Sequence, residues 1–162
     1  MRKKYVLPIV IVALLLVGVA LLTMVLSTTN NEFVKNITLN EKDITRESLE
    51  FSANGLKPGD VREYTINLKG KSVGIYTLVF DFVEVENGTL KNFVDVAMQY
   101  GQESYTFKLS ELLEGKTVSF QCRIGVKDST VVKVIYSMAV DIGNEAQSAT
   151  TDFAINLTAE KF

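Results

Sequence analysis

Apolar residues follow two different patterns along this chain. From Tyr5 to Leu26 they form one run without a charged side chain, whereas after Glu32 they alternate with polar residues in short segments. A run of about 20 apolar residues is what an α-helix needs to cross a bilayer. Alternation with a period of two is typical of strands that turn one face to a core and the other to water. The pattern therefore predicts one apolar helix followed by an all-β domain.

The apolar run is predicted to carry the rest of the chain out of the cell. Three basic residues (2–4) precede it and none follows until Lys35, an asymmetry that holds the amino end in the cytoplasm. Two interpretations stay open. The length of the run favours a retained single-pass signal-anchor, but Val25 and Ser27 could also serve as the −3 and −1 residues of a signal peptide cleaved before Thr28. We expect a cell-membrane protein with an extracellular C-terminal domain, or a secreted one if cleavage occurs.

The rest of the chain divides into a tether and one β domain. We expect residues 1–27 to be the signal-anchor or transmembrane helix, 28–47 a polar tether with one weak strand, and 48–162 the extracellular domain. About seven to nine short strands at roughly ten-residue spacing, with a single helical turn near Ser110–Glu114, predict an all-β fold. The expected architecture is an antiparallel β-sandwich. The strands are expected at Ser48–Ser52, Val61–Leu68, Ile75–Val85, Phe93–Tyr100, Tyr105–Phe107, Thr117–Val126, Val131–Val140 and Phe153–Glu160.

Two turn motifs stand near opposite ends of this domain. In the first, Leu56-Lys57-Pro58-Gly59-Asp60, proline fixes φ at one central position and glycine supplies a positive φ at the next, which is the signature of a type II turn. The second is the polar connection before the last strand, with Gly143, Asn144 and Gln147. We interpret both as structural turns.

The residue types that are missing exclude several kinds of chemistry. The chain has no histidine, so Ser-His-Asp and Cys-His catalysis and every histidine-containing metal site are excluded. The single cysteine, Cys122, cannot form an internal disulfide and is expected to be a small buried residue on one face of a strand. We therefore predict no catalytic, cofactor-binding or metal-binding residues, no cofactor, and no enzymatic activity.

The charge balance speaks against nucleic acid as a partner. The chain has 17 Lys and Arg against 19 Asp and Glu; three of the basic residues precede the apolar run, so 14 remain and the outer part is near −5. A nucleic-acid-binding domain needs a basic patch. The predicted contacts are instead with the membrane, through the N-terminal helix, and with other surface proteins.

The two turn motifs, taken together with the strands beside them, point to a family. The chain has Leu49-Glu50-Phe51-Ser52 followed by Leu56–Asp60, and it ends in Gly143-Asn144-Glu145-Ala146-Gln147 before Phe153–Glu160. This arrangement resembles the TasA/camelysin family of secreted bacterial surface and biofilm-matrix proteins. The resemblance implies a jelly-roll or immunoglobulin-like sandwich at the cell surface, assembly into fibres, and, for camelysin, a surface metalloprotease. The family's signal peptide and Phe-rich start are not evident here, since residues 28–48 are polar and charged.

The leading hypothesis is a non-catalytic surface protein that mediates adhesion or matrix and fibre assembly. Self-association, or association with sibling surface proteins, would occur by strand addition at an open sheet edge, with Phe33–Leu39 or the terminal strand as the donor. The alternative is an extracellular domain that binds a glycan or a peptide as the accessory part of a membrane complex. A camelysin-like protease fits less well, because zinc held without any histidine is a poor match to the preferences of that metal.

Overall fold

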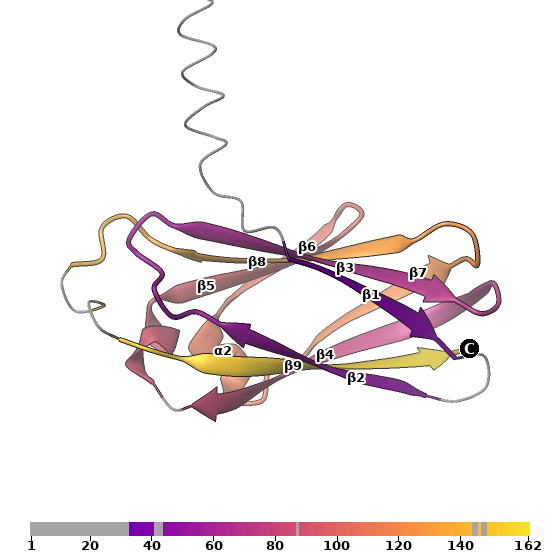
Figure 1. Cartoon of the computed structure of the whole chain (residues 1–162), viewed down its shortest axis with the longest axis horizontal. Helices are drawn as coiled ribbons and strands as arrows, with labels where there is room; N and C mark the ends of the chain where they lie inside the picture. The colour runs from indigo at the N-terminus through magenta and orange to yellow at the C-terminus, as the bar shows by residue number, and fades with distance from the viewer. Residues whose placement is uncertain (1–32, 41–43, 87, 144–145, 147–148) are drawn as a thin grey trace, which may run out of the picture. The chain divides into compact units, whose positions relative to one another are not determined.

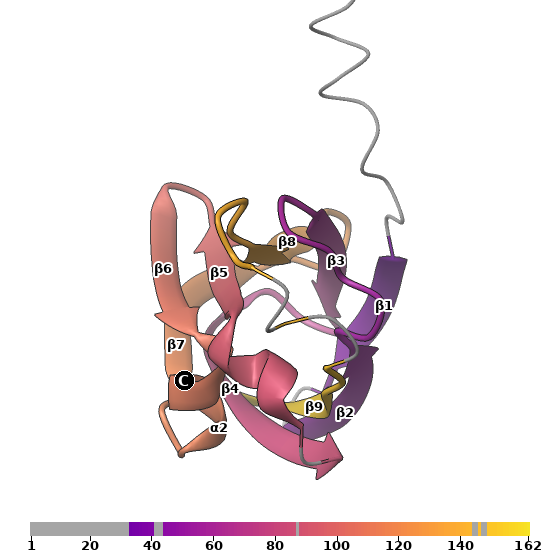
Figure 2. The same ribbon diagram turned by 90° about the vertical axis from the view of Figure 1, so that its left-hand side faces the viewer.

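The described part of the chain is a sandwich of two β-sheets. In the computed structural model, residues 33–40, 44–86, 88–143, 146 and 149–162 are described. They form a five-stranded and a four-stranded sheet that lie face to face (Figures 1 and 2), which confirms the predicted all-β sandwich. The predicted anchor at Tyr5–Leu26 lies outside the described residues.

Strands from distant parts of the chain are neighbours in both sheets. The five-stranded sheet has the order β1 (Phe33–Leu39), β3 (Val61–Gly70), β8 (Thr130–Met138), β5 (Val94–Tyr100) and β6 (Glu103–Lys108). The four-stranded sheet has the order β2 (Thr45–Ser52), β9 (Asp152–Lys161), β4 (Gly74–Glu86) and β7 (Val118–Ile124).

One strand pair departs from the predicted antiparallel arrangement. β1 runs parallel to β3, with Ile37 opposite Leu68. A parallel pair needs a crossover connection, because a hairpin would reverse the second strand. Here β2 supplies the crossover: it lies in the other sheet and returns the chain to the end at which β1 began. The expectation of a wholly antiparallel sandwich is therefore wrong for this pair.

The sandwich includes residues that the sequence pattern placed in the tether. β1 and the first residues of β2 both fall within 28–47, and both pair with strands of the body. The described residues from Phe33 to Phe162 belong to one compact unit. The weak strand expected in the tether is thus an edge strand of the sandwich, and β2 begins at Thr45.

The core fills the space between the two sheets. Its largest fully buried side chains include Tyr76, Phe80, Phe120, Tyr136 and Phe153, each at most 1% exposed. Burying one large apolar side chain contributes about 1.5–3 kcal/mol relative to leaving it exposed. Because this core lies wholly within residues 37–159, the domain has what it needs to fold on its own.

Several sequence expectations about individual positions are confirmed. The last strand buries Phe153, Ile155, Leu157 and Ala159, and Cys122 is 2% exposed. The predicted helical turn is α2 (Leu109–Leu113), after which Gly115 takes a φ of 102°. The short 3-10 helix η1 (Thr89–Asn92) was not predicted. In the described ranges neither α2 nor η1, nor any other helix, is long and apolar enough to cross a membrane.

Candidate functional site

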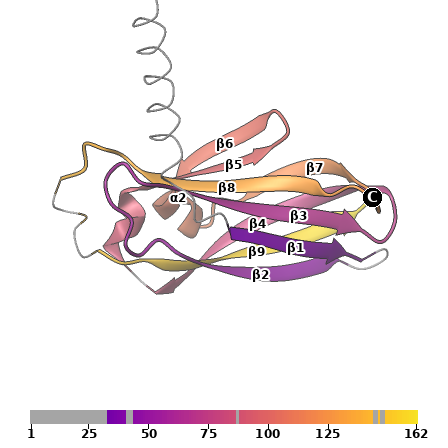
Figure 3. The same ribbon diagram turned by 45° about the horizontal axis from the view of Figure 1, so that its top comes forward.

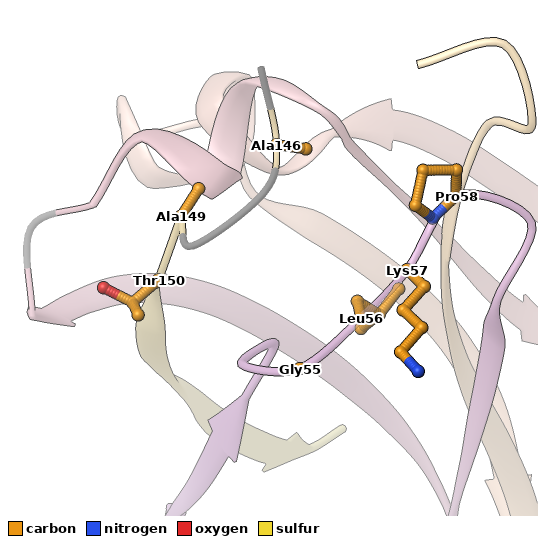
Figure 4. Close-up of a pocket in the computed structure, with 7 residues that line it drawn as sticks. All are labelled: Gly55, Leu56, Lys57, Pro58, Ala146, Ala149 and Thr150. Atoms are coloured by element: carbon orange, nitrogen blue, oxygen red, sulfur yellow. The ribbon is translucent and has the colours of Figure 1, made fainter. Parts of the chain in front are cut away.

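The first turn motif and the connection to β9 line a hollow of about 490 Å³ at one end of the sandwich. Figure 4 shows Leu56, Lys57 and Pro58 on one side of it, with Ala146 and Ala149 contributed by the connection to β9. Segments about 90 residues apart in the sequence therefore share a surface. The residues that line the hollow are Gly55, Leu56, Lys57, Pro58, Ala146, Ala149 and Thr150.

The first motif forms the turn that its sequence predicts. The N–H of Asp60 donates to the carbonyl oxygen of Lys57 at 2.9 Å, and Gly59 has a φ of +87°, the conformation that favours glycine. The Asp60 carboxylate accepts a second hydrogen bond from the Lys57 N–H at 2.9 Å. Gly59 N–H also donates to Met138 O at 2.9 Å, so the turn is fixed to the end of β8.

A polar network below the turn fixes the start of β9. Asn54 Oδ1 accepts from the N–H of Thr151 at 2.8 Å, and Asn54 Nδ2 donates to Asp152 Oδ1 at 3.0 Å. The Arg62 guanidinium donates to the carbonyl oxygens of Ser52 and Asn54 at 3.3 and 3.1 Å. Thr151 is fully buried, so the bond from its N–H to Asn54 satisfies a polar group that water does not reach.

The network went unpredicted because nothing in the local sequence marks it. Asn54 stands 97 positions before Thr151, and an asparagine beside a glycine is usually interpreted as a turn residue. The start of β9 is also held by close backbone packing against Gly88, where a Cβ would lie 1.5 Å from Thr150 O.

The chemistry of the hollow suits binding better than catalysis. Leu56 and Ala146 are buried and, with Pro58 and Ala149, give it an apolar lining. Its polar side chains are the exposed Lys57 and Thr150. An ammonium and a hydroxyl beside an apolar surface can hold a ligand that carries an acceptor or an anion next to an apolar group. Among the described residues that line it, none is an aspartate, glutamate or cysteine.

The other predicted turn residues contribute less to this site. Gly143 is exposed and does not line the hollow. Asn144 and Gln147 lie outside the described residues.

The Cys122 thiol and the Tyr136 hydroxyl are buried and remain protonated at neutral pH. Burial, followed by the effect of Glu103, raises the pKa of the Cys122 thiol to about 11. Burial also raises the pKa of Tyr136 far above its ordinary value. The Tyr136 hydroxyl donates to Ser52 O at 3.0 Å and lies 2.6 Å from the Tyr64 hydroxyl, so it is part of the packing between the sheets. Neither group is an activated nucleophile at neutral pH.

Acidic residues do not gather into a cation site in the part of the chain that the structure describes. No group of three or more Asp, Glu or Cys residues there is placed to hold a metal ion. Ion pairs found among described residues, such as Lys91–Glu84 at 2.6 Å and Lys108–Asp95 at 2.9 Å, join acidic side chains to lysines.

Comparison with known proteins finds distant structural likenesses. No protein-family model and no curated protein matches the chain. Among solved structures, the PRD1 vertex protein P5 is 16% identical with a TM-score of 0.41, over 72% of each chain. The extracellular region of zebrafish Gpr126/Adgrg6 is 16% identical with a TM-score of 0.40, over 78% of this chain and 15% of that one. The pre-peptidase C-terminal domain of a Bacillus anthracis collagenase is 13% identical with a TM-score of 0.36, over 82% of this chain and all of that domain. These likenesses are too distant to bear on function.

Proposed function

We propose that this chain is a non-catalytic cell-surface protein of the TasA-like kind that mediates adhesion or matrix and fibre assembly. It is held at the membrane through Tyr5–Leu26, or is secreted after cleavage before Thr28. The strand orders β2-β9-β4-β7 and β3-β8-β5-β6 are those of a jelly roll, with β1 added beside β3. This fold is one of the two subtypes that the resemblance implies, and it supports the proposal.

The observation that carries the proposal is the weak attachment of β1. β1 pairs with one strand, β3, and of its seven residues Ile37 and Leu39 are buried, whereas Phe33 and Val34 are 50% and 46% exposed. Such a strand can leave its own sheet and add to that of another copy, where Ile37 and Leu39 would be buried again. The terminal strand β9 is not available in this way, because it pairs with β2 on one side and β4 on the other.

The test compares a fragment of residues 28–162 with one of residues 44–162 that lacks β1. Sedimentation velocity should show assembly of the longer fragment into species larger than a dimer, which increase with concentration and are lost in the shorter one. A synthetic peptide of residues 33–39, added to the longer fragment, should inhibit assembly without any change to the protein. If the longer fragment stays monomeric at high concentration, the proposal fails.

A second function, ligand binding, is favoured by the hollow beside Lys57. An extracellular accessory domain would bind a glycan or peptide there, with its apolar part against Leu56 and an acceptor on the Lys57 ammonium. Lys57→Glu should abolish binding of any glycan or peptide identified by array, whereas Lys127→Glu, in the exposed β7–β8 connection, should leave it unchanged. A camelysin-like protease receives no support from residue chemistry, because the chain has no histidine to bind zinc.

A further inference from the structure

The two open sides of the sandwich are protected to different degrees. One side is formed by the edge strands β1 and β2 and the other by β6 and β7 (Figure 2). Soluble proteins commonly protect an edge by a charge that points inward, which discourages another strand from pairing there. Lys35 of β1 stands opposite the buried Ile66, and Glu47 of β2 opposite the buried Leu157, so both charges are on inner faces.

Strand β7 has no such protection. Its inner positions are Val118, Phe120, Cys122 and Ile124, all buried, and its single charge, Arg123, is on the outer face near one end. It contains neither proline nor glycine and spans 7 residues. By these criteria β7 is the least protected edge in the described part of the molecule.

Backbone groups of β7 are directed toward open space. Phe162 N–H donates to Ile75 O at 3.0 Å, so the backbone groups of Ile75 face β9, and those of the next residue, Tyr76, face β7. Tyr76 is paired with Cys122, so the backbone groups of Cys122 point back to β4, and so do those of Phe120 two residues away. The direction alternates along a strand, so the backbone groups of Ser119 and Gln121 point to the open edge. The Thr130 hydroxyl donates to Arg123 O at 3.3 Å on that same open side, which agrees with this assignment.

Aromatic side chains beside this edge are incompletely covered. Tyr105 of β6 is 41% exposed although it packs on Phe120, with ring centroids 5.5 Å apart. A groove of about 230 Å³ runs between the two strands, lined by Tyr105, Phe107, Thr117, Val118 and Ser119. Figure 3 shows the β5–β6 hairpin diverging from the neighbouring strands at its tip. Unpaired backbone and uncovered aromatic surface thus lie side by side, as at a site of strand addition.

We propose that β7 is the pairing edge of a symmetric dimer, in which the β7 strands of two copies join antiparallel about an axis at Ser119. This rests on the proposed assembly function and names one of its surfaces. In this register Ser119 faces Ser119 of the second copy, and Thr117 faces Gln121 of the second copy. No like charges oppose each other, and the residues whose backbone groups are free form the new ladder. The two four-stranded sheets become one continuous sheet, and the aromatic grooves of both copies meet at the seam.

Disulfide trapping tests the register. Directly opposed residues in a hydrogen-bonded antiparallel pair have Cα atoms about 5.5 Å apart, within the usual range for a disulfide. In the 28–162 fragment with Cys122→Ala as background, Ser119→Cys should give mostly cross-linked dimer under mild oxidation. Gln121→Cys alone should not, because its partner is Thr117, whereas a mixture of Thr117→Cys and Gln121→Cys fragments should cross-link. Ser48→Cys, on the exposed outer face of β2, is the matched control.

A charge at the same position provides an independent measurement. Ser119→Lys places two ammonium groups opposite each other and should raise the dimer dissociation constant at least about tenfold in sedimentation equilibrium. Ser48→Lys should leave it unchanged. Equal cross-linking of the Ser119→Cys and Ser48→Cys fragments, or an unchanged dissociation constant in Ser119→Lys, would overturn the proposal. Dimers of the 44–162 fragment that cross-link at position 119 would support β7 pairing, whereas species larger than a dimer in that fragment would refute the donor role of β1.

Discussion

The two open sides of this sandwich have similar backbones and different side chains. On the β1/β2 side, Lys35 and Glu47 share inner faces with buried residues, and both remain partly exposed. On the β6/β7 side, the corresponding positions of β7 are apolar, and those of β6 are Glu103, Tyr105 and Phe107, of which Glu103 is charged and exposed. Both sides have free strand edges. They differ in the free energy of burying the side chains beside those edges when another strand pairs there. Burying a charge without a partner is costly, whereas burying aromatic surface is favourable.

The two sides should differ most in the loss of stability that follows when one aromatic side chain is truncated on each side. Phe120 is 1% exposed and contacts Phe80, Tyr100 and Tyr105, so Phe120→Ala should lower the free energy of unfolding by about 3–5 kcal/mol. Phe33→Ala on β1 should lower it by less than about 1 kcal/mol, since that ring is already 50% exposed. Urea denaturation of the 28–162 fragment measures both. Equal losses would show that the two sides are packed alike.

Within β1, stability should depend on its few buried residues. Ile37 is 4% exposed and packs into the core from the edge of the sheet. Ile37→Ala should therefore cost about 2 kcal/mol, the lower end for such a truncation, because the edge can partly collapse. Ile75→Ala serves as the control, with a side chain 55% exposed and an expected change within about 0.5 kcal/mol. No loss in Ile37→Ala would mean that β1 is detached from β3 in solution.

Local patterns predicted the strands well and their neighbours poorly. Alternation identified the buried face of β7 and of β9, because period two is a property of each strand alone. It could not show that β9 is central and β1 is at an edge, since both alternate. The turn at Lys57–Asp60 was predictable from proline and glycine. The shared hollow of Leu56 and Ala146, and the bond from Asn54 to Thr151, join distant segments and depend on topology that no local pattern encodes.

The thiol of Cys122 reports how tightly the β7 side is closed. With its pKa raised to about 11, its thiolate fraction at pH 8 is roughly two hundredfold below that of a free cysteine, so alkylation of the native fragment should be slow. The pH dependence of stability has a definite sign. The unfolded thiol ionises near pH 8.5 and the folded one near 11, so the unfolded state holds fewer protons between these values. Stability should fall as pH rises through this window, and Cys122→Ala should abolish that part of the fall. Alkylation as fast as in urea would mean that the β6/β7 side opens readily.

The smallest effect on stability, and the sharpest test of the comparison, is expected at Lys35. Replacing it by isoleucine removes the inward charge from β1 and leaves a side chain that suits its position opposite Ile66. The free energy of unfolding should change by no more than about 0.5 kcal/mol, because the ammonium is partly solvated. In a Ser119→Lys background, where β7 pairing is blocked, Lys35→Ile should nevertheless increase self-association at least about threefold in sedimentation equilibrium, because the β1 edge would lose its protection. An unchanged association constant would show that the inward lysine does not protect this edge, and that the contrast between the two sides has another cause.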